Sequence, residues 1–191
     1  SAILQKRNEE SYDLLMKFSK LIRTTINSAN VLSRPLKEEL DFVKNYLDLQ
    51  RIRHEDLFDY NIQTDPGINM FQPVPKMILQ TYVENSLRHG LVPKKREGRI
   101  SILVKSTGKG IVLTVEDNGI GREQAKSNGT LSTGVGLSII GQYYALLNHD
   151  NERPITETFT DLYDEEGKAA GTRVEVFIPE GFGFPGEAHG K

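Results

Sequence analysis

Two strand-like segments joined by a tight turn constrain the fold of this chain more than any other feature. "RISILVKS" (residues 99–106) and "GIVLTVEDNG" (110–119) are connected by "TGKG" (107–110), a pattern typical of an antiparallel hairpin. A second pair, "PITETFTDLYD" (154–164) and "GTRVEVFIP" (171–179), surrounds the turn-like "EEGKAAG". "FDYNIQTD" (58–65) also alternates like a strand. A β-sheet therefore forms one layer of the predicted fold.

Helical spacing of apolar residues accounts for most of the remaining sequence. It predicts helices over residues 3–32, from Leu36 to about Arg53, over 74–90 with a start near Pro73 to Pro75, and over 134–148. Ser33-Arg34-Pro35 separates the first two, because proline cannot continue a helix interior. The second helix should bury one side, formed by Leu40, Val43, Leu47 and Ile52. We therefore expect an α/β (α+β) two-layer sandwich, with a mixed sheet packed on helices, after a helical segment.

Composition limits the classes of function. Lys+Arg 24 against Asp+Glu 26 gives net charge −2, so no overall positive field attracts nucleic acid or an anionic membrane. The chain has no cysteine, which excludes disulfides and thiolate metal sites, and no apolar run of the roughly 20 residues needed to span a bilayer. We expect three parts: residues 1–33 as part of a helical hairpin, 34–181 as the main domain, and a glycine-rich, disordered tail over 182–191.

The helix expected over 74–90 carries an unusual polar end, "VENSLRHG" (83–90). Thr81, Asn85, Arg88 and His89 would share one helix face, whereas Leu79, Val83 and Leu87 would occupy the other. The Asn85 amide oxygen could bind Mg²⁺, which keeps most of its waters and takes few protein ligands. Arg88 could neutralise phosphate charge. Equally, this polar face could simply meet solvent.

Two glycine motifs follow. In "VEDNGIG" (115–121), Asp117 ends a hydrophobic strand and could accept a hydrogen bond from an exocyclic amine, while Gly119 and Gly121 would let a flat base lie against the backbone. In "GVGLSII" (134–140), Gly134 and Gly136 would expose backbone N–H groups to an anion at a helix start. Each motif alone is also explained by a plain turn or an ordinary helix start.

The order of these motifs resembles the Bergerat-type ATP-binding fold of sensor histidine kinases, Hsp90, type II topoisomerases and mismatch-repair ATPases. The resemblance implies ATP and Mg²⁺ as cofactors and residues 122–133 as the ATP lid. It places the Mg²⁺ ligand Asn85 in the N box and the adenine-binding Asp117 in the G1 box, with Thr172 supporting Asp117. The cofactor-binding residues it implies are Asn85, Asp117, Gly119, Gly121, Gly134, Gly136, Leu137 and Thr172.

A narrower resemblance is to the LytS-type sensor histidine kinases. "LKEELDFVKNYLDLQRIRH" and "VPKMILQTYVENSLRHGL" are similar to their S-L-x-x-E-L and P-x-x-x-L-Q-x-x-V-E-N-x-x-x-H-G segments, although Thr81 stands where a proline is common. Hydrolysing branches carry a Glu four positions before the magnesium Asn, and here that position is again Thr81. The resemblance thus favours phosphoryl transfer from ATP to a histidine, and then to an aspartate of a response regulator. The alternatives are a GHKL-type ATPase or a non-catalytic nucleotide-binding interaction module.

The expected catalytic residues are Glu84, Arg88 and His89. His89 could contact phosphate or pack against the lid, and Glu84 could orient the acceptor or pair with Arg88 at i+4. None of His54, His89, His149 and His189 has the P-H-F-x-x-N setting of the phosphoacceptor. We therefore expect the acceptor upstream of Ser1, with residues 3–32 as the second helix of a dimerisation hairpin. The resemblance also implies a LytTR-type regulator and a homodimer as partners, no nucleic acid, and a cytoplasmic domain of an inner-membrane protein.

Overall fold

The computed structural model describes residues 32–55, 57–95, 97–128 and 135–184, with the backbone alone described at 135–139. Its centre is a five-stranded sheet in the order β2-β4-β5-β7-β6. The strands are β2 (Phe58–Thr64), β4 (Gly98–Ser106), β5 (Gly110–Asp117), β6 (Thr156–Tyr163) and β7 (Ala169–Pro179). Both expected hairpins are present, and β7 pairs with β5 as well as β6. The sheet is mixed because β2 runs parallel to β4 and the other pairs are antiparallel.

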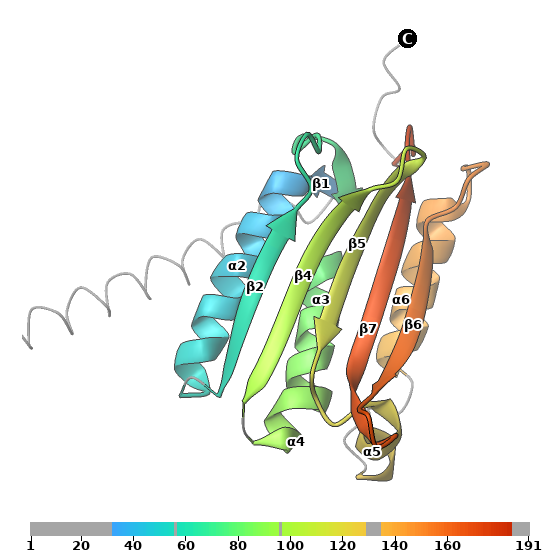
Figure 1. Cartoon of the computed structure of the whole chain (residues 1–191). Coiled ribbons are helices and arrows are strands. Elements are labelled where there is room, and N and C mark those ends of the chain that lie inside the picture. Colours follow the sequence, from blue (N-terminus) through green and yellow to red (C-terminus); the bar gives the residue numbers. More distant parts are fainter. Residues whose placement is uncertain (1–31, 56, 96, 129–134, 185–191) are drawn as a thin grey trace, which may run out of the picture.

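Three helices cover one face of this sheet and form the second layer (Figure 1). They are α2 (Leu36–Arg53), α3 (Ile78–Asn85) and α6 (Val135–Asn148). The hydrophobic core lies between the layers and joins Leu40, Val43 and Leu47 of α2 to inward-facing strand residues such as Ile102 and Val104. The predicted two-layer α/β sandwich is confirmed. Ile52 is the exception on α2, because its side chain is 56% exposed.

The predicted helix start near Pro73 to Pro75 is wrong. These residues form a short strand, β3 (Pro73–Pro75), which pairs antiparallel with β1 (Ser33–Pro35). A residue that precedes proline is biased toward extended backbone, which favours a strand at Val74 over a first helical turn. Helix α3 begins only at Ile78, after Met77 in the left-handed region with φ 63°.

The structure differs from two further expectations, one for the C-terminal tail and one for the lid. The expected disordered tail from residue 182 is wrong at its beginning, since the side chains of Phe182 and Phe184 are buried and their rings are in edge contact. The expected lid, 122–133, begins with a helix, α5 (Arg122–Ser127). Residues 1–31 of the expected hairpin, residues 129–133 of the lid and residues 185–191 of the tail lie outside the described residues. None of the helices in the described ranges combines the length and apolar content required to cross a lipid bilayer.

Candidate functional site

Asp117 is the most deeply buried of the predicted site carboxylates, with 4% of the residue exposed at the end of β5. Its Oδ2 accepts a hydrogen bond from Ser86 Oγ at 2.8 Å, and its Oδ1 accepts one from the backbone N–H of Gly119 at 2.8 Å. The backbone N–H of Thr172, opposite Asp117 on β7, also donates to the carboxylate. Burial raises the pKa of Asp117, and these donors oppose the shift. The predicted support from Thr172 thus comes from its main chain.

The loop after Asp117 packs directly against the helical segment that carries Ser86. A Cβ at Gly119 would lie 2.4 Å from the Cα of Gly90, so this close approach requires glycine at position 119. A Cβ at Gly90 would lie 2.9 Å from Oδ1 of the buried Asp117 carboxylate. The backbone N–H of Ile120 donates to the Gly90 carbonyl at 3.2 Å. Gly171, with φ 138°, passes so close to the strand end that a Cβ there would lie 1.9 Å from the Asp117 carbonyl oxygen. The buried carboxylate is therefore enclosed by backbone on two sides.

The helix that carries the polar cluster changes type within it. Helix α3 ends at Asn85, a π-helical turn η1 covers Ser86–Leu91, and a short α4 covers Val92–Lys94. A shared face for Asn85, Arg88 and His89 was expected from the spacing of a uniform α-helix. Thr81 and Asn85 keep the spacing of a regular α-helix, whereas Arg88 and His89 lie in a π-helical turn, which has i→i+5 bonding and occurs frequently at functional sites.

The predicted apolar side of this segment is confirmed, because Leu79, Val83 and Leu87 are buried. Asn85 is half-buried, and its side chain makes no hydrogen bond to another described residue. His89 is half-buried and Arg88 is exposed in η1.

Thr81 and Glu84 have different surroundings. The hydroxyl of Thr81 donates to the Met77 carbonyl one turn earlier, at 2.8 Å. Glu84 is exposed and makes no ion pair with Arg88 in the part of the chain that the structure describes. It lies near α2 instead: burial, and secondarily the charge of Glu84, raise the pKa of Tyr46 to about 12.

Helix α5 is attached to the edge strand β6. Arg122 donates from Nε and Nη2 to the two carboxylate oxygens of Asp161, each at 2.7 Å. Its guanidinium also lies 5.2 Å from the centroid of the Phe159 ring. Gly121 precedes the helix with φ 77°. The strand register aligns Asp117, Thr172 and Asp161 across β5, β7 and β6, so α5 is held beside the buried carboxylate.

The third predicted motif is described in part. Gly136 and Leu137 lie in the first turn of α6, which begins at Val135, and Gly134 lies outside the described residues. Among the described residues, no group of three or more His, Asp or Glu side chains could hold a metal ion. Such a group is not needed for Mg²⁺ bound mainly by water and phosphate oxygens. Asn85 suits that mode of binding, because its side-chain amide is half-buried and has no hydrogen-bond partner among the described residues.

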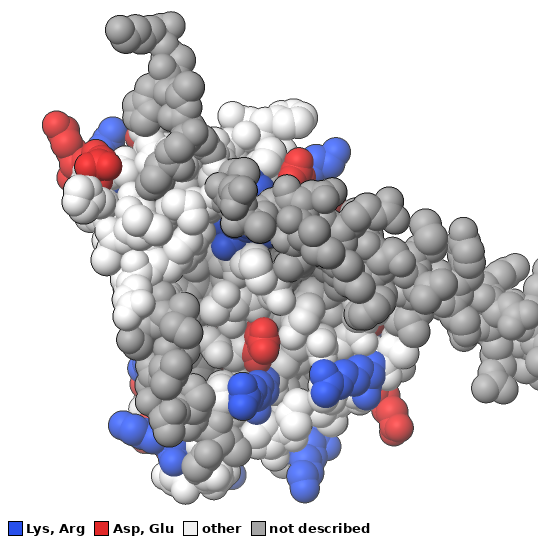
Figure 2. Space-filling view, turned by 180° about the vertical axis from the view of Figure 1, so that it is seen from behind, with Lys and Arg blue, Asp and Glu red and all other residues white. Residues whose placement is uncertain are grey.

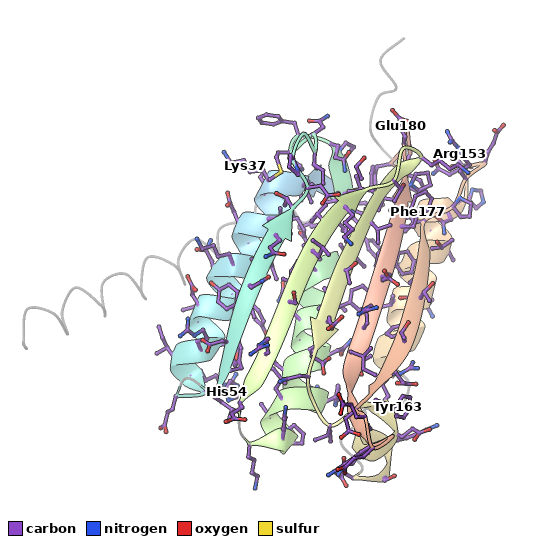
Figure 3. All side chains as sticks on the ribbon, viewed as in Figure 1. Lys37, His54, Arg153, Tyr163, Phe177 and Glu180 are labelled. Atoms are coloured by element: carbon purple, nitrogen blue, oxygen red, sulfur yellow. The ribbon has the colours of Figure 1, made fainter. Side chains whose placement is uncertain are left out.

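A cavity of about 530 Å³ lies elsewhere, between the loop at 67–72, the turn of the β4–β5 hairpin and Phe182. None of the predicted site residues lines it. Figure 3 shows that Lys37, Arg153 and Glu180 mark this upper end of the molecule, whereas His54 and Tyr163 mark the lower end, where α4 and α5 lie. The cavity and the buried Asp117 are thus at opposite ends of the sheet.

The family model described as "Histidine kinase-, DNA gyrase B-, and HSP90-like ATPase" matches residues 72–181. The chain belongs to this ATPase family. A second model, described as "Histidine kinase", matches residues 1–58. The region that this model matches contains Asn85, Ser86, Asp117 and Thr172. The enclosed carboxylate therefore lies in the ATPase domain.

The curated relatives of this chain include sensor proteins and a sensor histidine kinase. The chain is 24% identical over 192 residues to the sensor protein LytS of Enterococcus faecalis, covering 94% of the chain and 30% of that protein. It is 29% identical over 147 residues to the sensor histidine kinase YesM of Bacillus subtilis, covering 75% of the chain and 23% of that protein. The chain therefore spans less than a third of the length of these relatives. The resemblance to LytS-type sensor kinases is confirmed.

Solved structures support the same ATPase fold. The catalytic domain of the histidine kinase ThkA aligns with TM-score 0.51 at 18% identity, over 79% of this chain and 96% of that one. The histidine kinase AdeS of Acinetobacter baumannii aligns with TM-score 0.54 at 12% identity, over 94% of this chain and 83% of that one. The predicted Bergerat fold is confirmed.

Proposed function

We propose that this chain is the ATP-binding catalytic domain of a two-component sensor histidine kinase. The observation that carries the proposal is the enclosed carboxylate of Asp117. A carboxylate has about four acceptor positions, and Ser86, Gly119 and Thr172 fill three of them. One position remains for the exocyclic amine of adenine. A guanine would present a carbonyl there and would be disfavoured.

The phosphates would extend from this pocket toward Asn85 and the start of α6. Asn85 would hold Mg²⁺, which neutralises charge on the phosphate oxygens when bound. Gly134, Gly136 and Leu137 would receive the phosphates on backbone N–H groups, and Gly121 would leave room beside the base. Figure 2 shows mainly Lys and Arg at the lower end of the helix face, the end where α4 and α5 lie, which favours an anionic ligand there.

In the complete protein, a histidine imidazole outside this chain would attack the γ-phosphorus of ATP. A phosphorus–nitrogen bond would form, the bond between the γ-phosphorus and the bridging oxygen would break, and ADP would leave. Catalysis would rest on positioning and charge neutralisation, with Arg88 and His89 donating to phosphate oxygens. Glu84 would orient the incoming imidazole, which agrees with its exposure on the side of α3 that faces α2.

The phosphoryl group would then pass to an aspartate of a response regulator of the LytTR type. The intact protein would be a homodimer whose cytoplasmic kinase domain is attached to the inner membrane by a region outside this chain. Hydrolysis of ATP by water is disfavoured, because Thr81 lies four residues before Asn85 and binds the Met77 carbonyl. No general base is therefore present where the hydrolysing branches carry one.

Calorimetric titration with ADP and with a non-hydrolysable ATP analogue, with and without Mg²⁺, tests the proposal. The wild-type chain should bind both nucleotides, and Mg²⁺ should strengthen binding of the analogue. Asp117→Asn should weaken binding about 10- to 100-fold, the equivalent of one hydrogen bond to a charged group. Glu116→Gln is the matched control, because it removes a carboxylate one residue away on the opposite face of β5.

Absence of nucleotide binding by the wild-type chain, or equal affinity of Asp117→Asn and wild type, would refute the proposal. Steady phosphate release by the isolated chain would instead identify a hydrolysing ATPase.

A further inference from the structure

The N-terminus of α3 is capped by a residue from another helix. The backbone N–H groups of Met77 and Leu79 donate to the carboxylate of Glu39 at 3.1 and 3.0 Å, across 38 and 40 residues of sequence. The first N–H groups of a helix have no partner within it. Helix α3 has no capping side chain of its own at Met77. Glu39, fully buried in the first turn of α2, supplies that cap.

Arg34 of β1 provides the opposite charge. Its Nε lies 3.1 Å from Glu39 Oε2, and its guanidinium stacks 4.8 Å from the centroid of the Phe42 ring. Arg34 is 6% exposed, and its Nη1 and Nη2 atoms have no acceptor among the described residues. Burying such a pair is expensive, and an apolar replacement is often as stable. Stability alone therefore does not explain this pair, and a role in fixing the position of α3 is a hypothesis that would.

The capped helix leads directly into the proposed nucleotide site. From Leu79 to Ser86 the rise is about 10 Å at 1.5 Å per residue. The sequence of α3, "ILQTYVEN", contains no proline or glycine that would bend it. A displacement of its first turn would therefore reach Asn85 at its end and Ser86 in the next turn.

We propose that Glu39 is a positioning residue for nucleotide binding: together with Arg34 it fixes the axial position and rotation of α3, and thereby the places of Asn85 and Ser86. The proposal rests on the proposed function, because the affected ligand is the nucleotide. Among the described residues, Glu39 makes no hydrogen bond or ion pair with Asp117 or with the loop after it. Its effect on affinity is transmitted through α3.

Glu39→Gln tests this proposal with almost no change of volume. The Gln side chain keeps one acceptor oxygen and turns an NH₂ group toward a neighbouring donor, so one end of the cap is lost. Val104→Ala is the control, because Val104 is fully buried on β4 and its truncation destabilises the core without removing a hydrogen bond to α3. Both variants are titrated with ADP and with the Mg²⁺-bound ATP analogue, well below either midpoint of unfolding.

Glu39→Gln should weaken nucleotide binding about 3- to 30-fold, which is typical of substitutions that act through a packed network. Val104→Ala should change the nucleotide affinity by less than about twofold. Without nucleotide, the amide NMR signals of Ser86 and Gly119 should shift in Glu39→Gln and stay in place in Val104→Ala. If Glu39→Gln does not fold, Glu39→Asp carries the test, because its shorter carboxylate keeps the charge but cannot reach both donors. A smaller loss of affinity is then expected.

The inference is overturned if a Glu39 variant that is as destabilised as Val104→Ala binds nucleotide as tightly as wild type does. That result would leave the proposed function intact. Failure of the wild-type chain to bind nucleotide would overturn the proposed function instead. The two failures are therefore distinguishable in one set of titrations.

Discussion

Replacement of Ser86 by alanine measures how strongly the helical segment and the end of β5 are joined. Ser86 is 8% exposed, and its hydroxyl donates to the carboxylate of Asp117 at 2.8 Å. A hydrogen bond to a charged group contributes about 1.5–3 kcal/mol, and both partners are shielded from water here. Ser86→Ala should therefore lower the free energy of unfolding by about 1.5–3 kcal/mol, or Tm by roughly 3–12 °C for a domain of this size.

Urea denaturation near neutral pH, followed by circular dichroism, provides the measurement. Ser101→Ala is the matched control: the same hydroxyl is removed from β4, where Oγ lies 3.5 Å from Asn61 Oδ1 at an exposed contact. That control should remain within about 0.5 kcal/mol of wild type. Equal stabilities of the two variants would refute the argument that the Ser86–Asp117 bond holds the site together.

Two other perturbations test further parts of the structure. Gly119→Ala should cost about 1–3 kcal/mol in urea denaturation, because the added Cβ would lie 2.4 Å from the backbone of the π-helical turn; wild-type stability would contradict that close approach. The second perturbation is alkaline pH. Burial raises the pKa of both Tyr46 and Tyr143 from 10.0 to about 12. The unfolded chain then loses these protons first, so their contribution to stability is complete below pH 10 and is lost between pH 10 and about 12. Stability measured across that range should fall while tyrosinate absorbance stays low in the folded protein, and full ionisation near pH 10 would contradict the burial.

The sheet shows which parts of the fold local sequence determines. The first hairpin could be predicted because "TGKG" supplies glycines where the turn needs them, with φ 70° at Gly108. Alternation identifies a strand but not its neighbour. The parallel pairing of β2 with β4, and the place of β7 between β5 and β6, depend on contacts across the whole domain. Pro73 and Pro75 fit both a first helical turn and an edge strand, and the pairing with β1 decides for the strand.

The site was predictable at its strand end and less so on its helix. Asp117 follows a hydrophobic run and precedes glycines, so both its burial and the close approach of backbone can be inferred from sequence. Ser86 could not be inferred in the same way, because a uniform α-helix gives no reason to direct it at the sheet. Gly90 carried a usable signal: glycine inside a helix costs about 1 kcal/mol, and its presence there indicates that something approaches closely. Here the neighbour is Gly119.

The irregular backbone of the helical segment occurs where the segment contacts Glu39 and the proposed nucleotide site. Met77 has φ 63° where Glu39 caps α3, and the π-helical turn begins at Ser86, the residue that binds Asp117. Unfavourable backbone conformations persist where surrounding contacts determine them, and they cluster at functional sites. A regular α-helix through 74–90 would keep every helical hydrogen bond. It would not, however, place both the Gly90 backbone against the loop after Asp117 and the Ser86 hydroxyl against the Asp117 carboxylate. We infer that the interruption of the helix allows Gly90 and Ser86 to contact the end of β5 together.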